Sequence, residues 1–129
     1  MILEGDTWSG SRDLEWEASD PSFDGIRDAV ARLDGRTFTE VVVSAADRMR
    51  HLSVAGGPDL FLVTGELEDG RLLHLLSRGE SDSLVGLVCG GQQADFCRFE
   101  LVQKGVVLDA VSDFLDGFPN GLDGNWLVE

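Results

Sequence analysis

The sequence has few basic residues and no long apolar run. Ten Lys and Arg stand against 24 Asp and Glu in 129 residues, which gives a formal net charge of −14 at pH 7. This charge repels nucleic acid phosphates and anionic membranes and attracts basic partners, although acidity can also serve solubility alone. No apolar stretch approaches the roughly 18 residues that cross a bilayer. We therefore expect neither direct binding of nucleic acid nor a membrane protein.

The N-terminus lacks a basic segment followed by an apolar core. The chain starts Met-Ile-Leu-Glu-Gly-Asp, which is unlike a secretory signal. The expected location is therefore the cytoplasm.

Cysteine and histidine are scarce. The cysteines are Cys89 and Cys97, and the histidines are His51 and His74. Two sulfurs cannot form a structural zinc site, which needs about four ligands, and neither histidine has the spacing of a metal ligand. Cytoplasmic cysteines are normally reduced, but both lie near one predicted turn, so a disulfide remains the alternative. No metal and no cofactor is predicted.

No catalytic arrangement stands out either. Ser44 and Ser53 lack the flanking residues of a nucleophile elbow, and the pairs Gly56–Gly57 and Gly90–Gly91 do not precede helices as phosphate loops do. A histidine on an apolar strand is more typical of packing than of general base catalysis. We expect a protein that is not an enzyme.

The first part of the chain predicts a strand and a helix. Residues 1–13 are rich in Gly, Ser and Asp and are expected to be loosely held, whereas 14–129 should form a single domain. Apolar and acidic residues alternate from Leu14 to Ala18, which indicates a strand with Trp16 facing the core. Asp20–Pro21–Ser22 then signals the start of a helix that ends near Gly35, with an apolar stripe of Ile26, Ala29, Val30 and Leu33.

The middle of the chain predicts strands in succession. Runs over 37–44, 51–55 and 60–67 are rich in β-branched and apolar residues. Asp69–Gly70 favours a two-residue hairpin turn. Pairing Glu68 with Arg71 across it would place His74 beside Gly65 on an apolar face.

Residues 84–102 predict a central hairpin of the sheet. Two apolar runs flank Gly90–Gly91–Gln92–Gln93, and a simple register would place Cys89 opposite Cys97. Gly90, Gly91 and Gln92 are expected to serve the turn, with the Gln92 side chain bonded to nearby backbone. A second helix follows, with the stripe Val107, Ala110, Val111 and Phe114, and Trp126 should fold the tail back onto the body.

These elements predict an α+β fold. We expect a mainly antiparallel meander sheet of about six or seven strands, with two helices packed on one face. The protein should be a monomer or a weak homodimer. The expected core includes Trp16, Ile26, Val30, Val41, Val43, Leu62, Leu87, Phe99, Val111 and Phe114.

A group of acidic residues surrounds the Asp69–Gly70 turn and the loop that follows the next strand. They are Glu66, Glu68, Asp69, Glu80 and Asp82. Facing a basic protein surface, such carboxylates would speed encounter and form charge pairs. The alternative is a solvated acidic rim without a partner.

Several short motifs together resemble the first immunity-protein family of bacterial polymorphic toxin systems. They are Trp16, Leu33–Gly35 with Thr37, Leu52–Gly57, Gly90–Gln92 and the late Trp126, in an order that spans about residues 14–127. The resemblance implies a small cytoplasmic protein that binds and silences a cognate toxin, such as a nucleic acid deaminase or nuclease with a basic cleft. The alternatives are an interaction module outside toxin systems, for example an effector chaperone, and a small enzyme.

Overall fold

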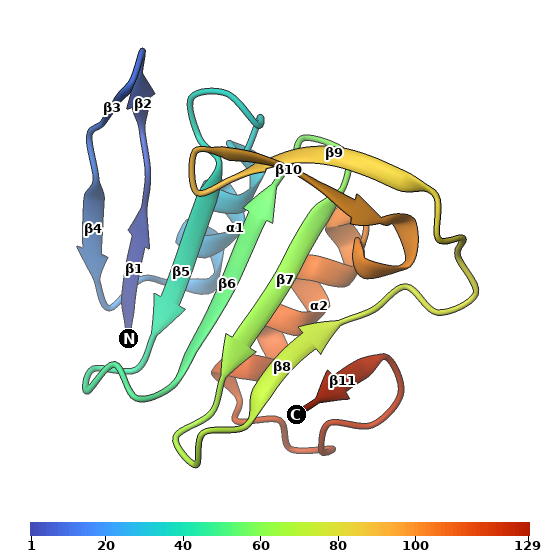
Figure 1. Cartoon of the computed structure of the whole chain (residues 1–129). Helices are drawn as coiled ribbons and strands as arrows, with labels where there is room; N and C mark the ends of the chain where they lie inside the picture. The colour runs from blue at the N-terminus through green and yellow to red at the C-terminus, as the bar shows by residue number, and fades with distance from the viewer.

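The computed structural model describes every residue from 1 to 129. Its main feature is a seven-stranded sheet in which all neighbouring strands are antiparallel. Helices α1 (Phe23–Ala31) and α2 (Lys104–Leu115) lie behind this sheet in Figure 1. The predicted α+β fold is confirmed. The strands lie in the order β11 (Trp126–Val128), β8 (Leu72–Leu75), β7 (Phe61–Glu66), β6 (His51–Gly56), β5 (Glu40–Ser44), β1 (Ile2–Gly5) and β4 (Trp16–Ser19).

Local sequence explains both helices. The backbone N–H of Gly25 donates to Ser22 Oγ at 3.0 Å, which caps α1 within the predicted start signal of residues 20–22. Ile26 and Val30 are completely buried, and the predicted stripe of α2 is buried from Val107 to Phe114. Neither helix has the length and apolar character needed to cross a bilayer.

The two faces of the sheet differ in character. Alternate residues of the central strands are buried against the helices, namely Val41, Val43, Leu52, Val54, Phe61, Val63, Leu73 and Leu75. Each such side chain contributes roughly 1.5–3 kcal/mol relative to exposure. No helix covers the opposite face (Figure 1), which carries Val42, Ser53 and Thr64. We call it the open face.

The expectation of a loosely held segment at residues 1–13 is wrong. Ile2–Gly5 is β1, an internal strand paired on one side with β4 and on the other with β5. Beyond it, β2 (Trp8–Ser9) and β3 (Arg12–Asp13) form a short hairpin. A strand of four residues gives little periodic signal, and its stability comes from two partners distant in sequence.

The β7–β8 register differs from prediction by one residue. Thr64 pairs with His74 and Gly65 with Leu73, because the connection spans 67–71 and Leu67 N–H donates to Arg71 O at 3.0 Å. A shift of one residue moves each side chain to the other face of a strand. His74 therefore lies on the open face beside Thr64, not beside Gly65.

The predicted central hairpin lies outside the main sheet. β9 (Leu84–Cys89) and β10 (Gln92–Cys97) form a separate two-stranded sheet, followed by a 3₁₀ turn at Arg98–Glu100. The hairpin crosses one end of the main sheet in Figure 1, and the Leu87 side chain approaches Gly56 of β6. The meander cannot continue past β8 because β11 occupies that edge, which confirms that the tail folds back.

The turn of this hairpin contains only Gly90 and Gly91, with φ of 59° and 80°. Cys89 therefore pairs with Gln92, and Cys97 with Leu84, so the expected opposition of the two cysteines is wrong. Both are free thiols. Gln92 is exposed and its side chain makes no hydrogen bond, which corrects its predicted role in the turn.

The predicted core is largely confirmed. Three members are only half-buried: Leu62, which lies on the open face, Phe99 in the 3₁₀ turn, and Trp16. Trp16 packs against the edge of the core, with the Arg32 guanidinium 5.0 Å from its ring centroid. Trp126 contacts Phe118 edge to face at 5.6 Å, which attaches the tail.

Candidate functional site

One row of directly opposed residues crosses the open face on all seven strands. In order they are Glu17, Glu4, Val42, Ser53, Thr64, His74 and Leu127. The row is acidic on β4 and β1, small and uncharged on β5, β6 and β7, occupied by His74 on β8, and apolar on β11. Strands are about 4.8 Å apart, so the row spans about 29 Å.

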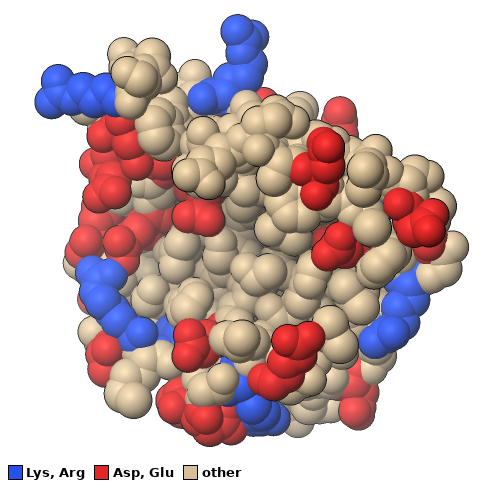
Figure 2. Space-filling model, viewed as in Figure 1, with Lys and Arg blue, Asp and Glu red and all other residues tan.

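The open face is hollowed. Figure 2 shows a depression lined by uncharged atoms in the middle of this face, with acidic side chains around it. The β9–β10 hairpin lies along its upper rim in that view, above the central strands. The fold therefore presents a concave surface with an acidic border.

An acidic pocket lies at one side of the depression, where β1, β4 and β5 run next to each other. It has a volume of about 490 Å³ and is lined by Glu4, Gly5, Asp6, Asp13, Glu15, Trp16, Glu17, Glu40, Val42 and Gly90. Six of these residues carry carboxyl groups and none is basic. Ionised carboxylates only accept hydrogen bonds, so the pocket is suited to a cationic donor.

Asp6 anchors the inner wall of this pocket. The residue is 7% exposed, and its carboxylate accepts hydrogen bonds from Thr39 N–H at 2.7 Å, Glu40 N–H at 3.0 Å and Trp8 Nε1 at 2.8 Å, as well as from the Thr39 hydroxyl. The Thr39 hydroxyl in turn accepts from Gly91 N–H at 2.9 Å. This network joins β1, β5 and the β9–β10 turn.

Glu40 lies between this network and the depression. Ser53 Oγ donates to its Oε2 at 3.2 Å. Burial raises the pKa of Glu40 above its ordinary value, the Ser53 hydrogen bond opposes that rise, and the nearby Asp6 charge adds to it. Burial and the Glu40 charge also raise the pKa of the neighbouring Cys89 thiol to about 11, which leaves Cys89 unreactive at neutral pH.

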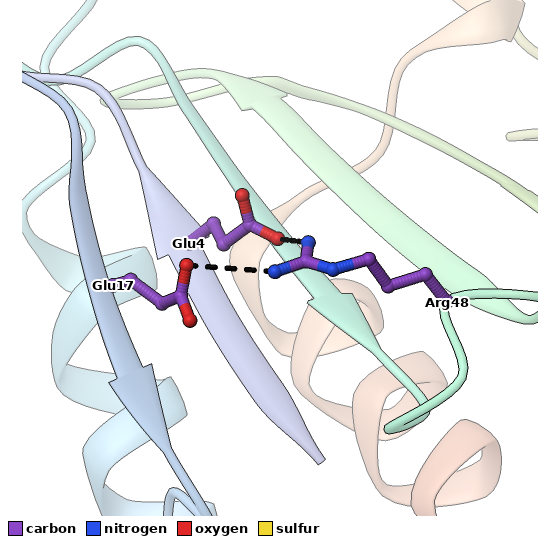
Figure 3. A network of polar contacts seen from close by, with 3 residues as sticks. All are labelled: Glu4, Glu17 and Arg48. Carbon is purple, nitrogen blue, oxygen red and sulfur yellow. Dashed lines mark hydrogen bonds and ion pairs between the residues drawn. The ribbon is translucent and has the colours of Figure 1, made fainter.

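Arg48 reaches the outer wall of the pocket from the β5–β6 loop. Its guanidinium forms ion pairs with Glu4 and, at 3.5 Å, with Glu17 (Figure 3). The remaining pocket carboxylates of Asp6, Asp13, Glu15 and Glu40 have no cationic side chain within 4 Å. The pocket thus keeps a large excess of negative charge.

The structure separates the five acidic residues singled out in the sequence. Glu66 lies on the open face at the end of β7, Glu68 and Asp69 lie in the turn before β8, and Glu80 and Asp82 lie in the loop after it. Strand β8 therefore stands between the two groups, which do not form one patch.

Three of these five carboxylates already have basic neighbours. Glu68 lies 3.8 Å from Arg50, Asp69 lies 2.8 Å from Arg71, and Glu80 lies 3.8 Å from Arg98. Hydrogen bonding from the Arg71 backbone lowers the pKa of Asp69. The five acidic residues therefore carry less unpaired negative charge than the six carboxyl groups of the pocket, which have only Arg48 as a basic neighbour within 4 Å.

Sequence reasoning missed the pocket because its residues come from distant segments. The alternation of acidic and apolar residues predicted a strand around Trp16, and β4 contains Glu17 but not Glu15; nothing local placed Glu4 beside Glu17. The short apolar run Ile2–Leu3 before Glu4 was the available signal. Only pairing of β1 with both β4 and β5 assembles the carboxylates.

No metal centre is formed, since no group of three or more His, Cys, Asp or Glu side chains is arranged to hold an ion. His74 Nε2 lies 3.1 Å from Glu100 O, so this ring bonds to backbone. Comparisons of the chain with protein-family models, with curated proteins and with solved structures found no match.

Proposed function

We propose that this chain is an immunity protein that binds and neutralises a cognate bacterial toxin in the cytoplasm. The resemblance of its motifs to an immunity family supports the proposal. Binding, rather than catalysis, inhibits the toxin. The toxin presents a basic surface and belongs to the nucleases or deaminases that act on nucleic acids.

One observation carries this proposal: a concave sheet face, uncovered by helices, lies beside a pocket with six carboxyl groups. A nuclease or deaminase cleft is basic because it holds phosphates. A surface of opposite charge steers encounter with such a cleft and competes with the nucleic acid for it. The inhibitor, a monomer or a weak homodimer when free, forms a stoichiometric complex with the toxin.

Co-expression with the adjacent gene product tests the function. The neighbour is expressed alone and together with this chain, and growth is measured. We expect the neighbour to arrest growth, this chain to restore it, and the two proteins to copurify in equal amounts. A harmless neighbour, or rescue without any complex, would contradict the proposal.

The sequence also suggested an interface at Glu68, Asp69 and Asp82, and the same assay examines it. A folded variant carrying Glu68→Lys, Asp69→Lys and Asp82→Lys reverses three charges on the two sides of β8. Because two of these carboxylates lie within 4 Å of arginines of this chain, we expect rescue to persist. Loss of rescue would place the interface at that edge.

A further inference from the structure

The open face has the composition of a docking surface. At its β8–β11 end, Leu72 is 51% exposed and Leu127 is 40% exposed, and both lie on the same face because Leu127 pairs with His74. At its other end lie Glu4 and Glu17. A partner that covers the row from Glu17 to Leu127 must therefore offer basic groups at one end and apolar groups at the other.

The length of the row favours a protein over a small cation. Its about 29 Å exceeds the reach of any single side chain or small molecule, so both ends are engaged only by an extended surface. The helix side of the sheet is already filled, whereas the open face is not.

Arg48 shows what kind of group the acidic end accepts. Glu4 and Glu17 are directly opposed on adjacent strands, a position where two like charges repel each other. The Arg48 guanidinium contacts both carboxylates (Figure 3) and relieves this repulsion. A planar guanidinium with several donors is matched to such a pair of carboxylates.

The Arg48 contact is also exchangeable. The Arg48, Glu4 and Glu17 side chains are 49%, 36% and 52% exposed, and exposed ion pairs contribute little net stability. Arg48 lies on a loop outside the sheet, so it can leave without breaking strand pairing. The pocket behind it then remains open to another cation.

We propose that the open face docks a basic surface of a protein partner, and that an arginine of this partner replaces Arg48 between Glu4 and Glu17. Apolar partner side chains cover Leu72 and Leu127 at the other end. This inference rests on the proposed function, which supplies the partner. To the proposed function it adds three statements: the partner binds the open face, an arginine of the partner binds Glu4 and Glu17, and Arg48 competes with that arginine.

The test measures the Kd of the purified chain for a catalytically inactive form of the adjacent gene product. The double variant Glu4→Gln, Glu17→Gln should bind at least tenfold more weakly, and Leu127→Ser at least threefold more weakly. Arg48→Ala removes the internal competitor and should bind more tightly, by about threefold.

Helix α1 provides a matched control. Asp24 and Asp28 flank Arg27 at 3.3 and 3.9 Å, on the covered side of the sheet. Asp24→Asn with Asp28→Asn makes the same change in net charge as the test pair, and Arg27→Ala matches Arg48→Ala. Both controls should stay within twofold of wild type, and thermal melting should show that every variant is folded.

The outcomes separate the two proposals. If wild type does not bind the neighbour, the proposed function fails and this inference fails with it. If wild type binds but the Glu4, Glu17 variant matches the α1 control, only the inference is overturned. If Arg48→Ala binds the neighbour more weakly than wild type, Arg48 does not compete with a partner arginine. If this chain forms a dimer that Leu127→Ser abolishes, a second copy of the chain, not a basic partner, covers the open face.

Discussion

Asp6 is a single buried carboxylate that joins three segments distant in sequence. It accepts hydrogen bonds from Trp8, Thr39 and Glu40, and Thr39 carries the connection to Gly91. All of its hydrogen-bond partners are donors, so a side chain with two accepting oxygens fits this position.

We predict that Asp6→Asn destabilises the protein by about 1–3 kcal/mol, because the amide NH₂ cannot accept hydrogen bonds and leaves a buried donor unpaired. Urea denaturation measures the free energy of unfolding. Asp109→Asn on the exposed side of α2 is the control and should change it by less than about 0.5 kcal/mol. Equal effects of the two substitutions would contradict the structural role of Asp6.

The raised pKa of Glu40 makes the free energy of unfolding depend on pH. Its pKa in the folded protein is raised above the ordinary 4.5, first by burial, so the folded protein holds this proton more tightly than the unfolded chain. The stabilisation is fully present below that ordinary value and is lost as pH rises through the folded pKa. Glu40→Gln cannot titrate.

We therefore expect the free energy of unfolding of wild type, minus that of Glu40→Gln, to decrease as pH rises from 4 to 7. Urea titrations at several pH values check this difference, in which the other titrating groups largely cancel. A difference that is flat or increases with pH would show that Glu40 is not desolvated.

Among the elements, the β9–β10 hairpin depends on its glycine turn for its position. Gly91 has φ of 80°, and a Cβ at this residue would collide with the Trp8 ring, whereas Gly70 has φ of 88° with nothing within 4 Å of the added atom. The two glycines therefore share the backbone requirement and differ in the collision.

We predict that Gly70→Ala costs about 1–2 kcal/mol from the left-handed backbone alone and that Gly91→Ala costs more. Gln92→Ala should change stability by less than about 0.5 kcal/mol because this side chain is exposed and makes no hydrogen bond. The free energies of unfolding of the three variants test this ranking. A cost for Gln92→Ala as large as that for Gly91→Ala would restore the expected role of Gln92 in the turn.

The whole chain carries a charge of −14, and β1, β4 and β5 concentrate part of it. Salt screens repulsion between exposed charges, with a Debye length of about 10 Å at 0.1 M. We predict that the melting temperature rises by several degrees between 0.02 and 0.3 M NaCl, as expected when screening reduces self-repulsion.

The variant Glu15→Gln, Glu17→Gln lowers the local charge and should show a smaller rise in calorimetry. A melting temperature that falls with salt in wild type would mean that attractive ion pairs outweigh the repulsion.

Patterns within one segment predicted much of the fold. The start signal at residues 20–22 and the 3.6-residue stripes identified both helices, because helix starts and helical burial depend on residues a few positions apart. The β-branched runs identified β5, β6 and β7 for a similar reason. Glycine's access to positive φ indicated a turn at the start of Gly90–Gln93, but the structure confines this turn to Gly90 and Gly91.

Pairing between distant segments decided the rest. The strand β1, the place of β11 beside β8 and the exclusion of β9–β10 from the main sheet depend on which edges remain free once other strands have paired. The one-residue shift at 67–71 moved His74 to the open face. The acidic pocket follows from the same cause, since Glu4, Glu17 and Glu40 meet only when β1 lies between β4 and β5, and no local pattern encodes that order.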